Sequence, residues 1–206
     1  KLSNPTLATY IKPDGVYLRI TAKAKEKAEA QRLVAQSEEK IRNVLSSHIW
    51  GVDDDTLDSV IGQLLRAKNM SLATMESSTE GLLCSTIASG RESCTYFKGG
   101  LLACCDEAKI TCGVDISVIQ QYGRESPQLA KAMAETACRK LKADIGMGVG
   151  GNMNLDENSG DVFICLYSDK FGQTFTHKLH GNLSRMKQRA VYAALFDLRR
   201  ILLEEI

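Results

Sequence analysis

The stretch from residue 71 to residue 109 constrains the fold more than any other part of the sequence. A short apolar strand at residues 71–75 runs into a cluster of hydroxyl side chains at residues 76–81 (ESSTEG), and a helix is predicted from residue 79 to residue 89. A helix that begins there leaves unpaired backbone N–H groups, and the positive end of its dipole, at the end of the strand. We therefore expect this position to hold an anion or a developing oxyanion.

A second strand and helix in the same stretch bring a lysine toward the hydroxyl cluster. Residues 99–104 indicate a buried strand, and residues 106–112 indicate a helix that carries Lys109. A serine beside a lysine whose pKa is lowered by burial is a known pair of nucleophile and base. Ser77 and Lys109 are therefore the candidate catalytic residues. The alternatives are that Ser77 only caps the helix and that Lys109 is a solvated surface lysine.

The composition of the chain is that of an ordinary globular protein. The chain has 206 residues, 44% hydrophobic residues and a formal net charge of +1, which is ordinary for a globular protein and offers no basic field for nucleic acid. Without a signal peptide or a membrane-length apolar run, a cytoplasmic location and no membrane partner are expected. The chain begins with Lys1 rather than Met, which is compatible with a segment of a longer protein.

The cysteine pattern argues against a disulfide framework and against a zinc site. The number of cysteines is odd and no C-x-x-C pair is present. We therefore expect the cysteines to be small buried apolar residues of a protein in a reducing compartment. These are Cys84, Cys94, Cys104, Cys105, Cys112, Cys138 and Cys165.

Two domains are predicted. Residues 1–52 form a small α+β domain, with a strand at 16–23, a helix at 25–45 and a short strand at 47–51, and this domain is too small to bury much core alone. Residues 53–206 alternate strands and helices, which predicts a three-layer α/β/α sandwich around a mainly parallel or mixed sheet. Ligands of such sheets bind beyond the carboxyl ends of strands, where Ser77, Gly150 and Asn152 are expected to lie.

The remaining elements of the second domain follow from periodicity and capping signals. Ser126 is expected to cap a helix that has Pro127 at its first position and continues through residues 129–141, and residues 150–160 are predicted to be a loop. The other predicted elements are helices at 57–68 and 184–203 and strands at 143–149, 161–167 and 174–179.

Two further patterns are assigned to structure rather than to ligand binding. The glycines at 146, 148, 150 and 151 resemble a dinucleotide fingerprint, but the first two lie within a strand and no helix follows, so close packing in the sheet is the better interpretation. His177 and His180 lie three residues apart on a predicted strand, which places them on opposite faces and disfavours a metal site.

The order of several motifs resembles the CinA family over almost the whole chain. The motifs lie at residues 4–6 (NPT), 53–57 (DDDTL), 76–79 (ESST), 97–100 (FKGG), 106–109 (DEAK) and 126–134 (SPQLAKAMA). The resemblance implies a KH-like domain followed by the C-terminal amidase domain of that family, without its N-terminal molybdopterin-binding-like domain.

The C-terminal domain of CinA proteins is similar to amidases that hydrolyse nicotinamide mononucleotide to nicotinate mononucleotide and ammonia. The resemblance implies that Ser77 is the nucleophile and Lys109 the base, without a cofactor or a metal, and that the protein is a homodimer that binds a pyridine nucleotide. The helix opening at Thr79 is expected to stabilise charge. The further substrate-binding candidates are Thr79, Gly81, Cys104, Gly150 and Lys187.

The chain departs from the family pattern around these residues. Glu80 stands where the family has a glycine, Cys104 stands where it has a tyrosine, and residues 150–155 (GGNMNL) lack the family's threonine. Of the basic positions near the last helix, one is Leu183 and another is Lys187. These departures keep open a second hypothesis, a catalytically degenerate module for nucleotide binding or dimerisation. Binding of single-stranded nucleic acid is disfavoured, because residues 1–51 contain no Gly-x-x-Gly loop.

Overall fold

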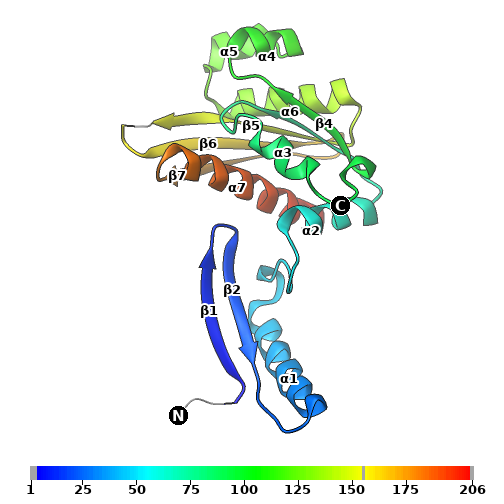
Figure 1. The fold of residues 1–206 in the computed structure, drawn as a ribbon. Helices are drawn as coiled ribbons and strands as arrows, with labels where there is room; N and C mark the ends of the chain where they lie inside the picture. The colour runs from blue at the N-terminus through cyan, green and yellow to red at the C-terminus, as the bar shows by residue number, and fades with distance from the viewer. Residues whose placement is uncertain (1–3, 155, 205–206) are drawn as a thin grey trace. The chain divides into compact units, whose positions relative to one another are not determined.

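The computed structural model describes residues 4–154 and 156–204, which form two compact units. The first unit ends at Asp55 and the second begins at Thr56. Figure 1 shows a strand hairpin with one long helix in the first unit and a sheet with several helices in the second.

The first unit consists of a β-hairpin and a helix. Strands β1 (Thr6–Lys12) and β2 (Gly15–Thr21) pair antiparallel, and helix α1 (Lys27–Leu45) lies beside β2 (Figure 1). The sequence interpretation missed β1, although Pro13 and Asp14 form the turn between two alternating segments. Its strand at 47–51 is wrong, because Ser46–His48 is a 3₁₀ turn. No described residue between 4 and 55 is buried, as expected for so small a unit.

The second unit is built on a five-stranded mixed sheet in the order β4-β3-β5-β6-β7. The first three strands in this order run parallel to one another, and β6 and β7 continue the sheet antiparallel. The three parallel strands therefore end at the same edge. The strands are β3 (Leu72–Glu76), β4 (Phe97–Leu102), β5 (Ile145–Asn154), β6 (Ser159–Tyr167) and β7 (Gly172–His180).

Helices cover both faces of this sheet, which confirms the predicted three-layer α/β class. One face packs against α6, and the other packs against α7 with α2 and α3 beside it (Figure 1). Two shorter helices, α4 and α5, contribute to the α6 side. The helices are α2 (Leu57–Ala67), α3 (Leu82–Ala88), α4 (Asp106–Cys112), α5 (Ile116–Tyr122), α6 (Pro127–Leu141) and α7 (Leu183–Glu204).

The main differences from the sequence interpretation are two element boundaries and one additional helix. Helix α3 begins three residues later than expected, because Glu80 and Gly81 adopt left-handed backbone angles. The predicted loop at 150–160 is wrong, because β5 and β6 pair through to Asn154 and Ser159. Helix α5 was not predicted.

Glycines in β5 allow α6 to lie directly against the sheet. A Cβ atom on Gly146 would lie 2.0 Å from the carbonyl oxygen of Ala134, and one on Gly148 would lie 2.0 Å from that of Ala130. This confirms the interpretation of this glycine run as close packing rather than as a phosphate loop. The contact fixes β5 against α6 immediately before β5 reaches Gly150.

The cysteines differ from expectation in their burial. Cys165 is buried, but Cys94, Cys104 and Cys105 are exposed, so the expectation that all seven are core residues is wrong for these three. All seven thiols are free. Within the described residues, no helix combines the length and the apolar character that crossing a membrane requires.

A carboxylate connects the starts of two neighbouring strands. The Asp144 carboxylate accepts hydrogen bonds from the Ser71 backbone N–H at 2.7 Å and from the Ser71 hydroxyl at 2.5 Å. The pKa of Asp144 is lowered, most strongly by the hydrogen bond from the Ser71 side chain and next by the hydrogen bond from the Ser71 backbone. The ionised Asp144 therefore contributes to folding stability at pH values above its unfolded-state pKa. This contribution is lost as the pH falls through its lower folded-state pKa.

We expect Asp144→Ala to lower the free energy of unfolding by about 1 kcal/mol at pH 7, since the bonds are charge-assisted but solvent-exposed. The difference from the wild type should shrink below about pH 4. Urea unfolding at pH 7 and below about pH 4 measures this difference in the free energy of unfolding. The control is Asp156→Ala, on the exposed turn between β5 and β6. A cost at low pH equal to that at pH 7 would show that the carboxylate charge is not responsible.

Candidate active site

The two candidate catalytic residues line one cavity in the second unit. The cavity has a volume of about 300 Å³ and lies beyond the carboxyl ends of β3 and β4. Ser77 directly follows β3, and Lys109 lies on α4, which follows β4. Its lining comprises Ser77, Ser78, Glu80, Cys104, Cys105, Asp106, Lys109, Arg124, Glu125 and Gly151.

Ser77 is held in place through its backbone. Its N–H donates to the carbonyl of Val149 on β5 at 3.0 Å, so the residue continues the parallel pairing of β3 with β5 by one position. Its hydroxyl lies 3.5 Å from the same carbonyl, which is a long hydrogen bond. The hydroxyl is therefore only weakly engaged and remains available to another acceptor.

Lys109 is buried, with 4% of its surface exposed. Its Nζ lies 3.8 Å from Asp106 Oδ1, one turn earlier on α4. Arg124 Nε and Nη2 both donate to the other oxygen of Asp106, at 2.9 and 2.7 Å. This hydrogen bonding, and then the attraction of the Asp106 charge, raises the pKa of Arg124. Asp106 is thus placed to stabilise an ammonium on Lys109, and Arg124 fixes the orientation of the Asp106 carboxylate.

The backbone N–H groups at the start of α3 already donate hydrogen bonds to a buried carboxylate. Glu76, which is 1% exposed, accepts hydrogen bonds from the N–H groups of Leu83 at 3.2 Å and Cys84 at 2.9 Å. Thr79 is also buried, and its hydroxyl donates to Glu76 at 2.5 Å. The expectation that this helix start offers unpaired N–H groups to an oxyanion is therefore wrong, because Glu76 occupies the position of the anion.

The other substrate-binding candidates lie at different distances from the cavity. Cys104 lines it, and its thiol lies 3.8 Å from the Ser77 carbonyl. A Cβ on Gly150 would lie 3.4 Å from the Ser77 hydroxyl, so this glycine leaves room beside the nucleophile. Gly81 forms the left-handed N-cap of α3, and Lys187 on α7 forms an ion pair with Glu80. Of the five substrate-binding candidates only Cys104 belongs to the described lining; Thr79, Gly81, Gly150 and Lys187 do not, and the glycine that lines the cavity is Gly151.

Several lining residues were not singled out as site residues from the sequence. The Ser78 hydroxyl is buried and has no hydrogen-bond partner among the described residues. Its place next to Ser77 was a local signal, and Asp106 was visible three residues before Lys109. Arg124 and Glu125 had no such signal, because they follow α5 and reach the cavity only through the tertiary fold.

The histidine pair occupies separate environments, away from the cavity lining. His177 Nε2 lies 2.7 Å from the Asp197 carboxylate on α7, whereas His180 is exposed. Burial raises the pKa of Asp197, and the hydrogen bond and charge of His177 oppose this. In the part of the chain that the structure describes, no cluster of three His, Cys, Asp or Glu side chains could hold a metal ion.

Both parts of the chain match models of known protein families. Residues 54–202 match the model of the CinA C-terminal domain, and residues 1–51 match that of the KH domain of the damage-inducible protein CinA. The chain belongs to the CinA family. This confirms the resemblance inferred from the motifs.

Relatives of this CinA-family chain carry the name competence-damage inducible protein. One from Moorella thermoacetica is 43% identical over 149 residues, covering 72% of this chain and 36% of that protein. One from Caldicellulosiruptor saccharolyticus is 33% identical over 207 residues, covering 98% of this chain and 50% of that protein. The chain thus spans about half or less of the length of these relatives.

Solved structures of CinA superfamily proteins share the fold of this CinA-family chain. The protein from Escherichia coli has a TM-score of 0.66 and 22% identity, covering 76% of this chain and 98% of that one. A protein from Klebsiella pneumoniae described as competence damage-inducible protein A has a TM-score of 0.68 and 21% identity, covering 73% and 97%. At these identities the likeness establishes the fold alone.

Proposed function

We propose that the second unit is an amidohydrolase that uses Ser77 as nucleophile and Lys109 as base. The observation that carries this proposal is the placement of both side chains on one small cavity, with Lys109 buried and Asp106 beside its Nζ. A serine hydroxyl needs an adjacent base to become nucleophilic. Within residues 4–154 and 156–204, the Ser77 hydroxyl makes only the long 3.5 Å contact to the Val149 carbonyl, so its proton is not held elsewhere.

The proposed reaction proceeds in two steps. The neutral amine of Lys109 takes the Ser77 proton as Oγ attacks the amide carbon. The resulting ammonium then protonates the amide nitrogen, which leaves as ammonia when the C–N bond breaks, and the acyl group remains on Oγ as an ester. Water next attacks the Ser77 ester while Lys109 accepts its proton, and the return of that proton to Oγ releases the carboxylic acid. Asp106 stabilises the ammonium in both steps.

The resemblance described above supports a pyridine carboxamide as the substrate, with nicotinamide mononucleotide as the reference compound. Hydrolysis would give nicotinate mononucleotide and ammonia. A cytoplasmic location and a homodimer belong to the same proposal.

The direct test is product formation by the purified chain. We expect ammonia and nicotinate mononucleotide to appear in equal amounts, and the activity to follow the protein peak in size-exclusion chromatography. Enzymatic ammonia detection and proton NMR measure the two products separately. Activity that elutes apart from the protein, or no turnover of any pyridine carboxamide, would remove the proposal.

A non-catalytic function is the second candidate, and one observation favours it. Glu80, on the cavity, is paired with Lys187, so two charged side chains are fixed at the edge of the site. In this alternative the cavity binds a nucleotide without hydrolysing it. Calorimetric binding of the mononucleotide without release of ammonia would support it.

A further inference from the structure

We propose that Arg124 is a positioning residue, which favours the neutral amine of Lys109 by holding the Asp106 carboxylate away from it. The inference rests on the proposed function, because it concerns how Lys109 becomes able to accept the Ser77 proton. It is carried by the way in which the two oxygens of Asp106 are divided between Arg124 and Lys109.

The backbone that carries Arg124 is fixed on both sides. The N–H of Gly123, directly after α5, donates to the Ile119 carbonyl at 2.9 Å, and Gly123 has a φ of +84°, which glycine adopts readily. The Ser126 hydroxyl donates to the Gly123 carbonyl at 3.4 Å and accepts a hydrogen bond at the start of α6. Arg124 therefore extends from an anchored turn, and it lines the cavity.

The two oxygens of the Asp106 carboxylate contact different cations. Arg124 Nε and Nη2 donate to Oδ2 at 2.9 and 2.7 Å, whereas Lys109 Nζ lies 3.8 Å from Oδ1. The contacts of Arg124 are hydrogen bonds, and that of Lys109 is an ion pair beyond hydrogen-bond distance. Asp106 is thus bound to Arg124 and only near Lys109.

The distance between Lys109 and Asp106 matters because Lys109 has little other support for a positive charge. Its side chain is only 5% exposed, so water contributes little to stabilising an ammonium there. Within residues 4–154 and 156–204, Asp106 is the only carboxylate that forms an ion pair with its Nζ. If Asp106 moved closer, it would hold the proton on Nζ, and less of the neutral amine would be present to accept the Ser77 proton.

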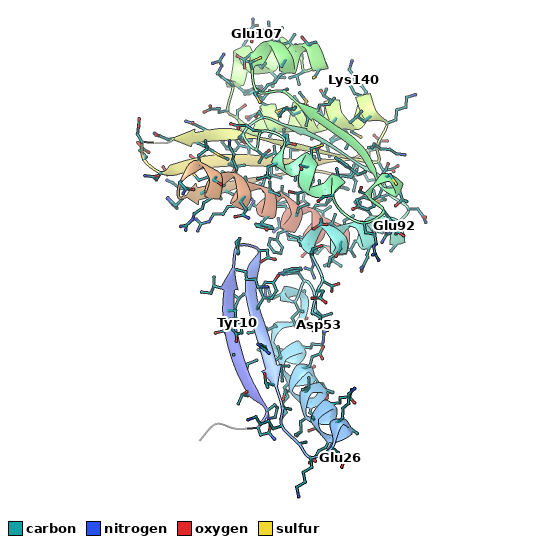
Figure 2. All side chains as sticks on the ribbon, viewed as in Figure 1. Tyr10, Glu26, Asp53, Glu92, Glu107 and Lys140 are labelled. Carbon is teal, nitrogen blue, oxygen red and sulfur yellow. The ribbon has the colours of Figure 1, made fainter. Side chains whose placement is uncertain are left out.

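The positive charge of Arg124 acts in the same direction. A guanidinium stays protonated, and the pKa of Arg124 is raised by its hydrogen bonds to Asp106, then by the Asp106 charge, and further by the charges of Glu107 and Glu125. Glu107 is labelled on α4 in Figure 2. A cation on the same carboxylate disfavours a second positive charge on Lys109, and a lysine beside another cation is a known source of a neutral amine.

The other carboxylates of the lining do not take the place of Asp106. Glu80, on the turn before α3, forms an ion pair with Lys187 of α7, and Glu125 lies on the segment before α6. In the part of the chain that the structure describes, neither of these carboxylates forms an ion pair with Lys109. Helices α5 and α6 contribute apolar side chains to the cluster that packs against α4. The remaining ionisable groups of the lining are exposed thiols, those of Cys104 and Cys105.

The test is the deprotonation of Lys109 in the wild type and in Arg124→Ala. In protein labelled with carbon-13 lysine, the Cε chemical shift reports the charge of each amine, and the Lys109→Met protein identifies the signal. We expect the midpoint of deprotonation to rise by about one pH unit in Arg124→Ala, a roughly tenfold change in proton affinity, because Asp106 can then approach Nζ. Arg124→Lys keeps the cation and should restore about half of this shift or more.

Arg42→Ala is the matched control. Arg42 on α1 donates Nε and Nη2 to one oxygen of Glu38 at 2.8 and 2.6 Å, which is the pattern of Arg124 on Asp106. Arg42 does not belong to the described lining of the cavity, so the midpoint of Lys109 should not change. In the Asp106→Asn background, the shift caused by Arg124→Ala should fall to less than about half, because the charge through which Arg124 acts is absent.

Fluorophosphonate labelling of Ser77 between about pH 6 and pH 10 separates this inference from the proposed function. At pH 7 we expect labelling to be about tenfold slower in Arg124→Ala, and at high pH to reach the wild-type rate. A Lys109 midpoint that Arg124→Ala leaves unchanged would overturn the inference, as would a shift that Arg124→Lys fails to restore or that persists in full in Asp106→Asn. Labelled Ser77 with an unchanged midpoint retains the hydrolase alone. A shifted midpoint without label on Ser77 retains the action of Arg124 on Lys109 and removes the hydrolase.

Discussion

Ser77→Ala is expected to lower the rate of amide hydrolysis by at least about a thousandfold, because the variant has no oxygen that can attack the amide carbon. The fold should be unaffected, since the hydroxyl contributes only a long contact of 3.5 Å to the Val149 carbonyl. We expect the free energy of unfolding to change by less than about 1 kcal/mol. Ammonia release at saturating substrate measures the first effect, and urea unfolding measures the second.

The matched control is Ser85→Ala, which removes the same atom from an exposed position on α3. This variant should keep the wild-type rate. Equal rates for the wild type, Ser77→Ala and Ser85→Ala would show that hydrolysis does not proceed through Ser77.

Gly148→Ala is expected to destabilise the second unit by about 3 kcal/mol or more. The added Cβ would lie 2.0 Å from the Ala130 carbonyl oxygen and 2.7 Å from the Ala134 nitrogen. Both atoms belong to the backbone of α6, so the clash cannot be relieved by a side-chain rotation, and helix and strand must separate. Urea unfolding followed by circular dichroism measures the loss.

Gly172→Ala is the control for this change. Gly172 lies at the start of the edge strand β7, where an added Cβ would meet only the Tyr167 ring at 3.8 Å, an ordinary contact. We expect this variant to remain within about 1 kcal/mol of the wild type. A Gly148→Ala protein as stable as Gly172→Ala would contradict the account of how α6 packs on β5.

The sequence was sufficient to predict the layered fold because the apolar periodicity of the second unit matches its burial. Strand β3, for example, is buried at all five positions, and Ser126 caps α6 as expected through its bond to the Leu129 N–H at 3.2 Å. One misjudged segment is residues 150–160, where glycine and asparagine were taken as a sign of a loop. In β5, Gly150 and Asn152 continue the ladder with β6, because cross-strand pairing decides the conformation there.

The candidate site was predictable only in part, for a similar reason. Ser77 and Lys109 follow two adjacent parallel strands, and this topology alone brings their elements to one edge. The occupation of the α3 N–H groups by Glu76 could not be foreseen, because it depends on the left-handed turn at Glu80 and Gly81. The pairs between Arg124 and Asp106 and between Lys187 and Glu80 join residues 18 and 107 positions apart, beyond any local pattern.

The central claim is that Lys109 activates Ser77, and covalent labelling tests it most directly. A fluorophosphonate reacts with an activated serine, and peptide mass spectrometry identifies the residue that is modified. We predict labelling at Ser77 in the wild type, at least about a hundredfold slower labelling in Lys109→Met, and an unchanged rate in the exposed Lys98→Met control. Absence of label on Ser77, or the same rate of labelling in Lys109→Met as in the wild type, would contradict the account.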